Sequence, residues 1–458
     1  MSTNEDGQRQ QVRLCDRLVI AGTHSGVGKT TVSVAIMTAL RKKGLKIAAA
    51  KVGPDFIDPT YHRLATGHHS VNLDVFLHGK ELILPLAAEA AEGSDMLITE
   101  GVMGLFDDSG FRFGGGSTAE VAKLLQAPVI LIIDCAAMST SVKAVVHGFS
   151  TLDKELNVKG VILNRVASKG HELLLREALE DTDINVIGVL EKKDAFNFEE
   201  RHLGLVPAVE EKSKIMETLD RLAAEISDSL DLEQLVKIAN SAPTLWTSRA
   251  NKPHLVGQAR IGICSGKAFS FYYHQNLEYL QLAGAELSYF DPLTDEKLPP
   301  DLDALYMGGG FPEVYTAEIS KNRPLLDEIA AKARDNILIW AECGGYLLLC
   351  ESIDGHIMSG ILDSAKAEMT TKLTLGYRYG YTLRDTIFGP SNTEIKGHEY
   401  HYSQVEPAGE DLFLSGRLHS GAQGYAAGNI FASYLHQHMA SRPEMAENLV
   451  TNAKRTDG

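Results

Sequence analysis

A glycine-rich segment near the amino terminus has the residue types that bind phosphate. The segment LVIAGTHSGVGKTT runs from an apolar stretch through a loop into Lys29 and Thr30, and a helix is predicted over 32–40. In such a strand–loop–helix context the backbone N–H groups surround phosphates, the lysine reaches the outer ones and the threonine hydroxyl ligates Mg²⁺. The spacing departs from the strict pattern, because Thr23 stands where the first glycine is expected. We predict a P-loop whose nucleotide contacts are Gly26, Gly28, Lys29, Thr30 and Thr31.

Four acidic residues follow predicted strands. KVGPDFIDPTYH places Asp55 and Asp58 beside prolines on a loop, and EGVMGLFD places Glu100 at a strand end with Asp107 in the next loop. Ligands bind at the carboxyl ends of strands in doubly wound sheets, so these acids are expected near the nucleotide. Glu100 has the position of a second metal-coordinating carboxylate. The metal set predicted here is Thr30, Asp55 and Glu100, and the substrate set is Asp55, Asp58 and Asp107.

A cysteine in the second half of the chain has the surroundings of a nucleophile. ILIWAECGGYLLL indicates a strand, a glycine-flanked turn carrying Cys343, and an apolar helix. Such a turn exposes the nucleophile, and the helix N-terminus is expected to lower the pKa of the thiol. MGGGFPE follows another strand, so its backbone can stabilise an oxyanion. The predicted oxyanion contacts are the N–H groups of Gly309, Gly310 and Gly344.

A cysteine nucleophile needs a base, and histidines supply four candidates. His436 follows an apolar run over 428–435, which places it at a strand end. His438 then points elsewhere and is interpreted as structural. His398 and His401 lie in an aromatic-rich, β-prone segment, where packing or substrate contact is favoured over metal binding. We therefore predict that His436 is the partner of Cys343.

The elements that must position these residues alternate between apolar strands and amphipathic helices, which favours a parallel α/β architecture. Strands are predicted in the first half at 17–21, 46–51, 95–100, 128–134, 160–164 and 186–189. Each is an unbroken apolar run, as in strands covered by helices on both faces. Asn164, at the end of one of them, is a candidate for reading the edge of an adenine ring.

A polar, proline-containing stretch divides the chain. Residues 241–258, SAPTLWTSRANKPHLVGQ, show no hydrophobic period, which is typical of a linker. A second series of strands is predicted after it, at 259–264, 286–290, 304–307 and 337–341. We therefore expect two α/β domains, 1–245 and 258–458, joined by a linker over 246–257.

Composition excludes several other classes of protein. With 44 basic and 60 acidic side chains the formal net charge of the 458 residues is −16, which argues against an electrostatic hold on nucleic acid or an anionic membrane. The five cysteines form no CxxC pair, so neither a disulfide framework nor a zinc site is expected. No signal peptide or membrane-spanning run is visible. We expect a cytoplasmic protein whose partners are small molecules.

These motifs resemble known families. The offset P-loop with its strand-end Glu-Gly resembles dethiobiotin synthetase and its relatives, and KVGPDFIDPTYH, EGVMGLFD and RHLGLVPAVE resemble the cobyrinic acid a,c-diamide synthase family more closely. The cysteine turn, MGGGFPE and His436 resemble the class I glutamine amidotransferase domain of cobyrinic and cobyric acid synthases. One departure is that His436-Gln437-His438 replaces the usual His-Pro-Glu. The third member of the triad is therefore unidentified, and Glu444 is not assigned to it.

The resemblance, which extends from about residue 17 to about residue 445, implies a two-site reaction. Its first part implies an ATP-binding amide synthase domain of the dethiobiotin synthetase type, and its second part a glutamine amidotransferase domain. Glutamine is expected to be hydrolysed at Cys343 through a γ-glutamyl thioester, with His436 moving the proton. Ammonia then passes internally to the first domain. There ATP and Mg²⁺ convert a substrate carboxylate to an acyl phosphate, which ammonia converts to the amide. The implied substrate is a corrinoid of cobalamin synthesis, amidated at its a and c acetate side chains.

Alternatives remain at this stage. Within the family, the substrate can instead be hydrogenobyrinic acid, which lacks cobalt, or Ni-sirohydrochlorin. In a different class, the first half is a nucleotide-dependent switch of the partitioning-ATPase type and the second a non-catalytic partner-binding domain. That class does not require a cysteine on a turn together with a histidine at a strand end, so we favour the enzyme. The residues leave open a homodimer, the order of the two amidations and which of Asp55, Asp58 and Asp107 binds metal.

Overall fold

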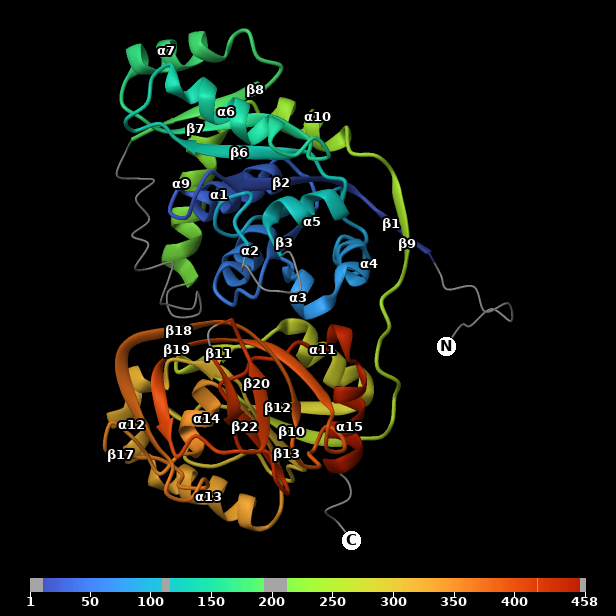
Figure 1. The fold of residues 1–458 in the computed structure, drawn as a ribbon, viewed down its shortest axis with the longest axis vertical. Helices are drawn as coiled ribbons and strands as arrows, with labels where there is room; N and C mark the ends of the chain where they lie inside the picture. The colour runs from blue at the N-terminus through green and yellow to red at the C-terminus, as the bar shows by residue number, and fades with distance from the viewer. Residues whose placement is uncertain (1–10, 109–115, 193–211, 418, 454–458) are drawn as a thin grey trace. The chain divides into compact units, whose positions relative to one another are not determined.

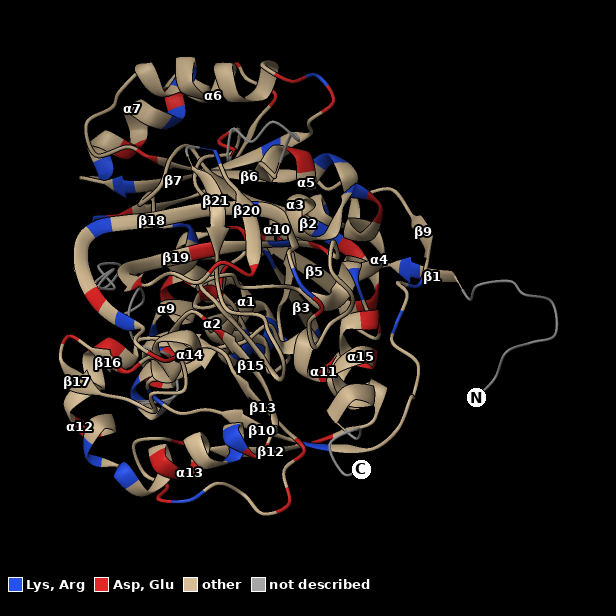
Figure 2. Cartoon of the chain, turned by 60° about the horizontal axis from the view of Figure 1, so that its bottom comes forward, with Lys and Arg blue, Asp and Glu red and all other residues tan. Residues whose placement is uncertain are grey.

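The computed structural model describes residues 11–108, 116–192, 212–417 and 419–453. The chain forms two compact units, Met1–Ala250 and Asn251–Gly458, and each has a parallel sheet flanked by helices (Figure 1). Acidic and basic residues are interspersed along the helices and strands of both units (Figure 2). The α/β class predicted from the sequence is confirmed.

A seven-stranded parallel sheet forms the centre of the first unit, in the order β4-β3-β5-β2-β6-β7-β8. Its strands are β2 (Asp16–Gly22), β3 (Ile47–Val52), β4 (Val71–Leu73), β5 (Met96–Glu100), β6 (Val129–Asp134), β7 (Val158–Val166) and β8 (Asn185–Glu191). Strand β3 is buried at every position, which explains why it is apolar apart from Lys51. All the strands predicted in this half are present, with ends shifted by one or two residues.

Helices cover the sheet. Four of them share a hydrophobic core with it: α1 (Lys29–Lys42), α2 (Asp58–Thr66), α9 (Lys212–Ser229) and α10 (Leu232–Asn240). Helices α1 and α9 contact one another along this face (Figure 1). The unit also contains α3 (Val75–His78), α4 (Lys80–Ala90), α5 (Thr118–Leu124), α6 (Ser141–Thr151) and α7 (Lys169–Leu179). No helix among the described residues is both long and apolar enough to cross a membrane.

One strand within the predicted linker was not expected. Strand β9 (Leu245–Ser248) pairs antiparallel with β1 (Gln11–Leu14), so part of the stretch interpreted as linker is an element of the first unit. A strand of four residues is too short to show a period. Its partner lies at the other end of the unit's sequence, so the local pattern gave no sign of the pairing.

The second unit has a five-stranded parallel sheet in the order β12-β10-β13-β15-β22. Its strands are β10 (Ala259–Cys264), β12 (Ala285–Phe290), β13 (Ala304–Met307), β15 (Leu338–Glu342) and β22 (Ile430–Ser433), which include the four predicted there. The helices are α11 (His274–Ala283), α12 (Thr316–Lys321), α13 (Arg323–Arg334), α14 (Gly344–Leu349) and α15 (Glu444–Ala453), with 3₁₀ turns η2 (Pro312–Tyr315) and η3 (Met439–Ser441).

A second, largely antiparallel sheet in this unit was not predicted. Its long hairpin is formed by β18 (Lys366–Thr382) and β19 (Glu394–Glu406), and the shorter strands are β16 (Ser352–Ile353), β17 (His356–Ile357), β20 (Leu412–Ser415) and β21 (Ser420–Gln423). The hairpin is half-exposed and its register shifts between Met369 and Thr374, which breaks a regular alternation. A further pair joins β11 (Phe269–Phe271) to β14 (Gly309–Gly310).

Candidate active sites

The predicted P-loop lies between the carboxyl end of β2 and the start of α1. Gly28 precedes the helix with φ 96°, and a Cβ added there would lie 2.7 Å from Nδ2 of Asn164. That amide donates to the carbonyl of Val27 at 2.9 Å, and Arg165 donates to the carbonyl of Gly26 at 2.9 Å. Residues at the end of β7 therefore hold the loop in shape. Contact of Asn164 with adenine stays a prediction.

The lysine of the loop is held close to its own backbone. Lys29 is buried and its Nζ donates to the carbonyl of His24 at 3.2 Å. Burial and the nearby Lys51 together lower the pKa of Lys29 to about 8, although three carboxylates act in the opposite sense. Thr31 lies buried in the first turn of α1. The nucleotide contacts assigned to these residues stay predictions.

A buried charge cluster lies beside this loop. Oε1 of Glu100 accepts from Oγ1 of Thr30 at 2.7 Å and from Nζ of Lys51 at 2.9 Å, and Oε2 lies 2.7 Å from Nε2 of His62. Nζ of Lys51 is also 2.5 Å from Oδ2 of Asp58. Burial alone favours a neutral Glu100, but Lys51 and His62 outweigh it and hold the pKa of that carboxyl well below its usual range. Glu100 is therefore an ionised carboxylate in a dry site.

The two aspartates of KVGPDFIDPTYH make different contacts. Oδ1 of Asp55 accepts from the N–H groups of Ile57 at 2.7 Å and Asp58 at 2.9 Å. Oδ2 of Asp58, by contrast, accepts from Oγ1 of Thr30 at 3.3 Å. Of these two aspartates, Asp58 is therefore the one whose carboxylate contacts Thr30. Asp55 is engaged with the backbone at the start of α2. The metal contact assigned to Asp55 stays a prediction.

The other loop acid, Asp107, shapes its own turn. Its Oδ2 accepts from the N–H of Gly104 at 2.8 Å, and its charge acts on the pKa of Lys29. It therefore lies near the lysine of the predicted P-loop, and its substrate role stays a prediction. The segment RHLGLVPAVE lies outside the described residues.

Two members of the cluster, Lys51 and His62, were not predicted from the sequence. Lys51 opens the segment KVGPDFIDPTYH and His62 closes it, yet neither was assigned a role. The register of the sheet pairs Lys51 on β3 directly with Glu100 on β5. The available signal was a lysine near the end of an otherwise apolar strand, since a buried charge needs a partner.

The hydroxyl and carboxylate oxygens of the cluster suit a magnesium ion. Thr30 and Glu100 offer hard oxygen ligands 2.7 Å apart. Mg²⁺ is usually held by one or two carboxylates together with substrate phosphates rather than by an all-protein cage. Within the described ranges no group of three or more His, Cys, Asp or Glu is arranged to hold a metal. The residues therefore fit an ion that binds together with a nucleotide.

Cys343 in the second unit follows β15 directly and adopts φ 49° and ψ −103°. Its Sγ lies 3.8 Å from the carbonyl oxygen of Tyr400. The side chain is only 6% exposed. Burial, together with the charge of Glu313, raises the pKa of the thiol well above its usual value, although the hydrogen bond from the N–H of Gly344 acts to lower it. The prediction of an exposed thiol with a lowered pKa was therefore wrong. The first turn of the six-residue helix α14 does not offset the loss of water.

His436 lies three residues beyond β22, which is the parallel neighbour of β15. The N–H of Cys343 donates to Ser433 at 2.8 Å, and His436 exchanges backbone hydrogen bonds of 2.9 and 3.1 Å with His398. A Cβ on Gly309 would lie 2.4 Å from Cε1 of His436, so the ring lies against the glycine loop. Burial, reinforced by neighbouring histidines, lowers the pKa of His436 well below its usual value. The ring is therefore neutral and can accept a proton.

The glycines predicted to bind the oxyanion lie together. A Cβ on Gly344 would be 3.1 Å from the backbone nitrogen of Gly310, so the cysteine turn and the MGGGFPE loop are in contact. Their oxyanion role stays a prediction. The remaining histidines pack: His401 stacks on Tyr434 with ring centroids 3.5 Å apart, and His438 lies 4.5 Å from the ring of Tyr273.

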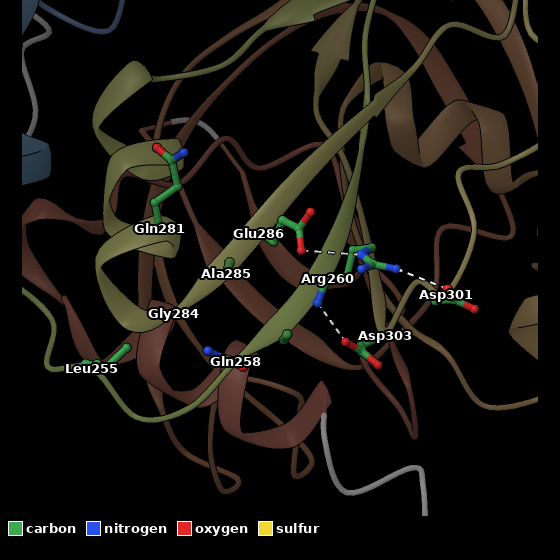
Figure 3. A pocket seen from close by; sticks show the side chains of 10 residues that line it. Leu255, Gln258, Arg260, Gln281, Gly284, Ala285, Glu286, Asp301 and Asp303 are labelled. Carbon is green, nitrogen blue, oxygen red and sulfur yellow. Dashed lines mark hydrogen bonds and ion pairs between the residues drawn. The ribbon is translucent and has the colours of Figure 1, made fainter.

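A surface cavity of about 590 Å³ lies elsewhere in this unit (Figure 3). Its lining includes Ala259 and Ala285, the first residues of β10 and β12, and Arg260, whose side chain pairs with Glu286 and Asp301. Ligands of such sheets bind at the carboxyl ends of the strands, where Cys343 stands. This cavity is at the amino ends, so it is not part of the candidate site.

Two family models match the chain, one in each unit. Residues 18–206 match the CobQ/CobB/MinD/ParA nucleotide binding domain. Residues 260–444 match the CobB/CobQ-like glutamine amidotransferase domain. The nucleotide-binding loop and the cysteine turn therefore each lie within a domain of the kind that the sequence predicted.

Curated relatives match the chain over almost its whole length. Hydrogenobyrinate a,c-diamide synthase of Streptomyces coelicolor is 41% identical over 96% of this chain and 97% of its own. Cobyrinate a,c-diamide synthase of Leptospira interrogans is 41% identical over 96% and 98%, and that of Methanobrevibacter smithii is 38% identical over 96% and 100%. The resemblance read from the motifs is confirmed, and the chain belongs to the cobyrinate and hydrogenobyrinate a,c-diamide synthase family.

Proposed function

We propose that this protein amidates the a and c carboxylates of cobyrinic acid, using ATP and ammonia released from glutamine. The observation that carries the proposal is identity of about 41% over 96% of the chain to a,c-diamide synthases. We assign the ATP-dependent step to residues 1–245 and glutamine hydrolysis to 258–458, with 246–257 between them. The proposal includes the cytoplasmic location predicted from the sequence.

In the first unit the buried cluster supports phosphoryl transfer to a carboxylate. A bound Mg²⁺ held by Thr30 and Glu100 would neutralise charge on the phosphates. Lys29 and Lys51 carry the other positive charges, and Asp58 lies 2.5 Å from Nζ of Lys51. The substrate carboxylate oxygen attacks the γ-phosphorus, ADP leaves, and an acyl phosphate forms. Ammonia then attacks the acyl carbon, and phosphate departs as the amide forms.

In the second unit the Cys343–His436 pair supports glutamine hydrolysis. Burial leaves Cys343 as a thiol and His436 as a neutral base, so the proton moves when the sulfur attacks the glutamine amide carbon. We assign the stabilisation of the developing oxyanion to the backbone N–H groups of Gly309, Gly310 and Gly344. His436 returns the proton to the departing ammonia. Water then hydrolyses the thioester to glutamate and restores the thiol.

The proposal is tested by separating the two nitrogen sources. Cys343→Ala is expected to abolish glutamine-dependent amidation and to leave ammonia-dependent amidation unchanged. Cys350→Ala is the matched control, because Cys350 is also buried, at 0% exposed against 6% for Cys343, and its Sγ donates to the carbonyl of Tyr346 at 3.5 Å. Full glutamine-dependent activity in Cys343→Ala would refute the assignment.

The macrocycle is identified by mass spectrometry. The purified protein is incubated with ATP, Mg²⁺ and glutamine plus cobyrinic acid, hydrogenobyrinic acid or Ni-sirohydrochlorin. Hydrogenobyrinic acid is tested at the same concentration as cobyrinic acid, because the Streptomyces coelicolor relative is named as a hydrogenobyrinate a,c-diamide synthase. Two amidations of cobyrinic acid support the proposal, whereas ATP hydrolysis without amidation of any macrocycle favours a nucleotide switch.

A further inference from the structure

The general base of the proposed glutaminase site lacks the acid that usually follows it. The segment reads His436-Gln437-His438, so no carboxylate stands two residues after the base. A catalytic imidazole depends on neighbours that fix its orientation. Some other group must therefore hold His436 in place.

A carboxyl group that bonds to the backbone next to His436 belongs to the residue before the nucleophile. Glu342 ends β15 and is 2% exposed. Its Oε1 accepts from the backbone N–H of Gln437 at 2.9 Å, and its Oε2 accepts from the hydroxyl of Tyr306 at 3.0 Å. Tyr306 is itself fixed by stacking on Trp340, with ring centroids 3.9 Å apart and planes 4° apart. The carboxyl group therefore has a single, well-supported position.

The backbone of His436 is held from several directions. The N–H of Gln437 belongs to the peptide group that follows the α-carbon of His436, so its bond to Glu342 restrains that α-carbon directly. Nδ2 of Asn276 donates to the carbonyl of Gln437 at 2.8 Å, and His398 exchanges backbone bonds with His436 itself. Of these contacts, only that of Glu342 comes from the residue adjacent to Cys343.

We propose that Glu342 is a positioning residue of the glutaminase site, which ties the residue before the nucleophile to the peptide group after the base. The proposal rests on the proposed roles of Cys343 and His436. Because one side chain spans both segments, it sets the distance and direction between sulfur and imidazole. Glu342 thereby orients His436 through a backbone hydrogen bond, whereas the usual triad acid orients the imidazole directly.

Glu342 works by hydrogen bonding rather than by charge. Burial raises the pKa of Glu342 to about 8, and both donors that it meets are neutral. A carboxyl group of this kind readily gives up its charge near neutral pH, yet a carbonyl oxygen at the same place still accepts the N–H of Gln437. An amide side chain of the same length should therefore replace it.

The test compares Glu342→Met with Glu342→Gln in the full-length protein. Methionine keeps the volume and removes both hydrogen bonds, so kcat for glutamine hydrolysis should fall about 10- to 100-fold while KM changes little. In the glutamine variant Oε1 can still accept the N–H of Gln437, and Nε2 can donate to the hydroxyl oxygen of Tyr306, so kcat should stay within about threefold of the wild type. Ammonia-dependent amidation should be unchanged in both. Asp411→Leu, which removes another buried carboxyl group bonded to a backbone N–H (Ala426, 2.9 Å), controls for general destabilisation.

A second readout reports the cysteine–histidine geometry itself. The rate of Cys343 alkylation by iodoacetamide is followed against pH by mass spectrometry of its peptide. The methionine variant should lose the reactivity that His436 confers near neutral pH, and the glutamine variant should keep it. A defect that is only structural would not separate these two profiles.

Several outcomes overturn the proposal. Wild-type kcat in Glu342→Met excludes a positioning role, and a loss in Glu342→Gln of tenfold or more shows that charge, not hydrogen bonding, is needed. If the methionine variant does not fold, Glu342→Asp decides, because its shorter side chain cannot reach both Gln437 and Tyr306. A loss of kcat relative to Glu342→Gln then supports the proposal, and wild-type kcat in both variants excludes it. Failure of the proposed function is seen separately, as glutamine hydrolysis that survives Cys343→Ala.

Discussion

Replacing Lys51 with methionine tests the buried charge cluster of the first unit most directly. Nζ of Lys51 lies 2.5 Å from Asp58 and 2.9 Å from Glu100, and the Lys51 and Glu100 side chains are 4% and 0% exposed. Methionine keeps the apolar stem and removes the ammonium group. Glu100 would then keep only the contacts with His62 and Thr30 in a site closed to water.

The expected cost follows from the burial of the pair. Removing one partner of a buried ion pair typically costs about 3–5 kcal/mol, because the other charge stays desolvated. For a unit of this size each kcal/mol corresponds to about 2–4 °C, so the midpoint of unfolding should fall by about 6–20 °C. Lys29→Met is the matched control. Its Nζ makes one bond of 3.2 Å to a carbonyl, and such a bond contributes about 1 kcal/mol.

Differential scanning calorimetry of the full chain measures this effect. In the wild type, the transition of the first unit is the one that ATP moves to higher temperature, because ligand that binds only the folded state stabilises it. Lys51→Met should lower that transition strongly and Lys29→Met only slightly. Both variants should lose ATP-dependent amidation, so the activity assay alone does not distinguish them.

Equal midpoints for the two lysine variants would refute the reasoning. That result would mean that the carboxylates near Lys51 are hydrated or protonated in the folded protein, and that no buried pair stabilises it. A lowered midpoint with full ATP-dependent activity would instead keep the structural role of Lys51 and exclude it from phosphoryl transfer.

Three further predictions concern single positions. Gly309→Ala places a Cβ 2.4 Å from Cε1 of His436, so glutamine hydrolysis should fall at least tenfold while ammonia-dependent amidation persists, as a coupled assay would measure. Gly28→Ala forces φ 96° on alanine and a Cβ 2.7 Å from Asn164, which costs about 1–2 kcal/mol and should weaken ATP binding about tenfold by isothermal titration calorimetry. Burial lowers the pKa of His438 to about 3, so below pH 6.5 the unfolded chain binds a proton that the folded chain does not. This histidine should therefore withdraw about 2 kcal/mol of stability from the second unit between pH 7.5 and 5, and His438→Asn should reduce that loss in pH-dependent thermal unfolding.

The accuracy of the strand predictions followed burial. Strands β3 and β15 are buried at every position, and each is apolar apart from Lys51 and Glu342 near its carboxyl end, so each could be recognised in the sequence. The hairpin of β18 and β19 alternates irregularly between exposed and buried positions, and its register shifts partway along. A strand of that kind has no period of its own, so it was missed although it carries His398.

The sequence by itself determined which short segments carry chemistry. The P-loop with Lys29 and Thr30, the acid Glu100 and the cysteine turn at Cys343 are local motifs, because each chemical task needs a fixed loop conformation built from neighbouring residues. The identity of these segments needed no long-range contact. The residues that surround these segments in space, by contrast, depend on long-range contacts.

Only the tertiary structure decided the partners of these residues. Lys51 meets Glu100 across 49 positions of sequence and Glu342 meets Gln437 across 95, because parallel strands far apart in the chain come into register. Burial raised the thiol pKa of Cys343, which the turn alone was expected to lower. Register and burial arise from the packing of whole sheets and helices, so no local pattern contains them.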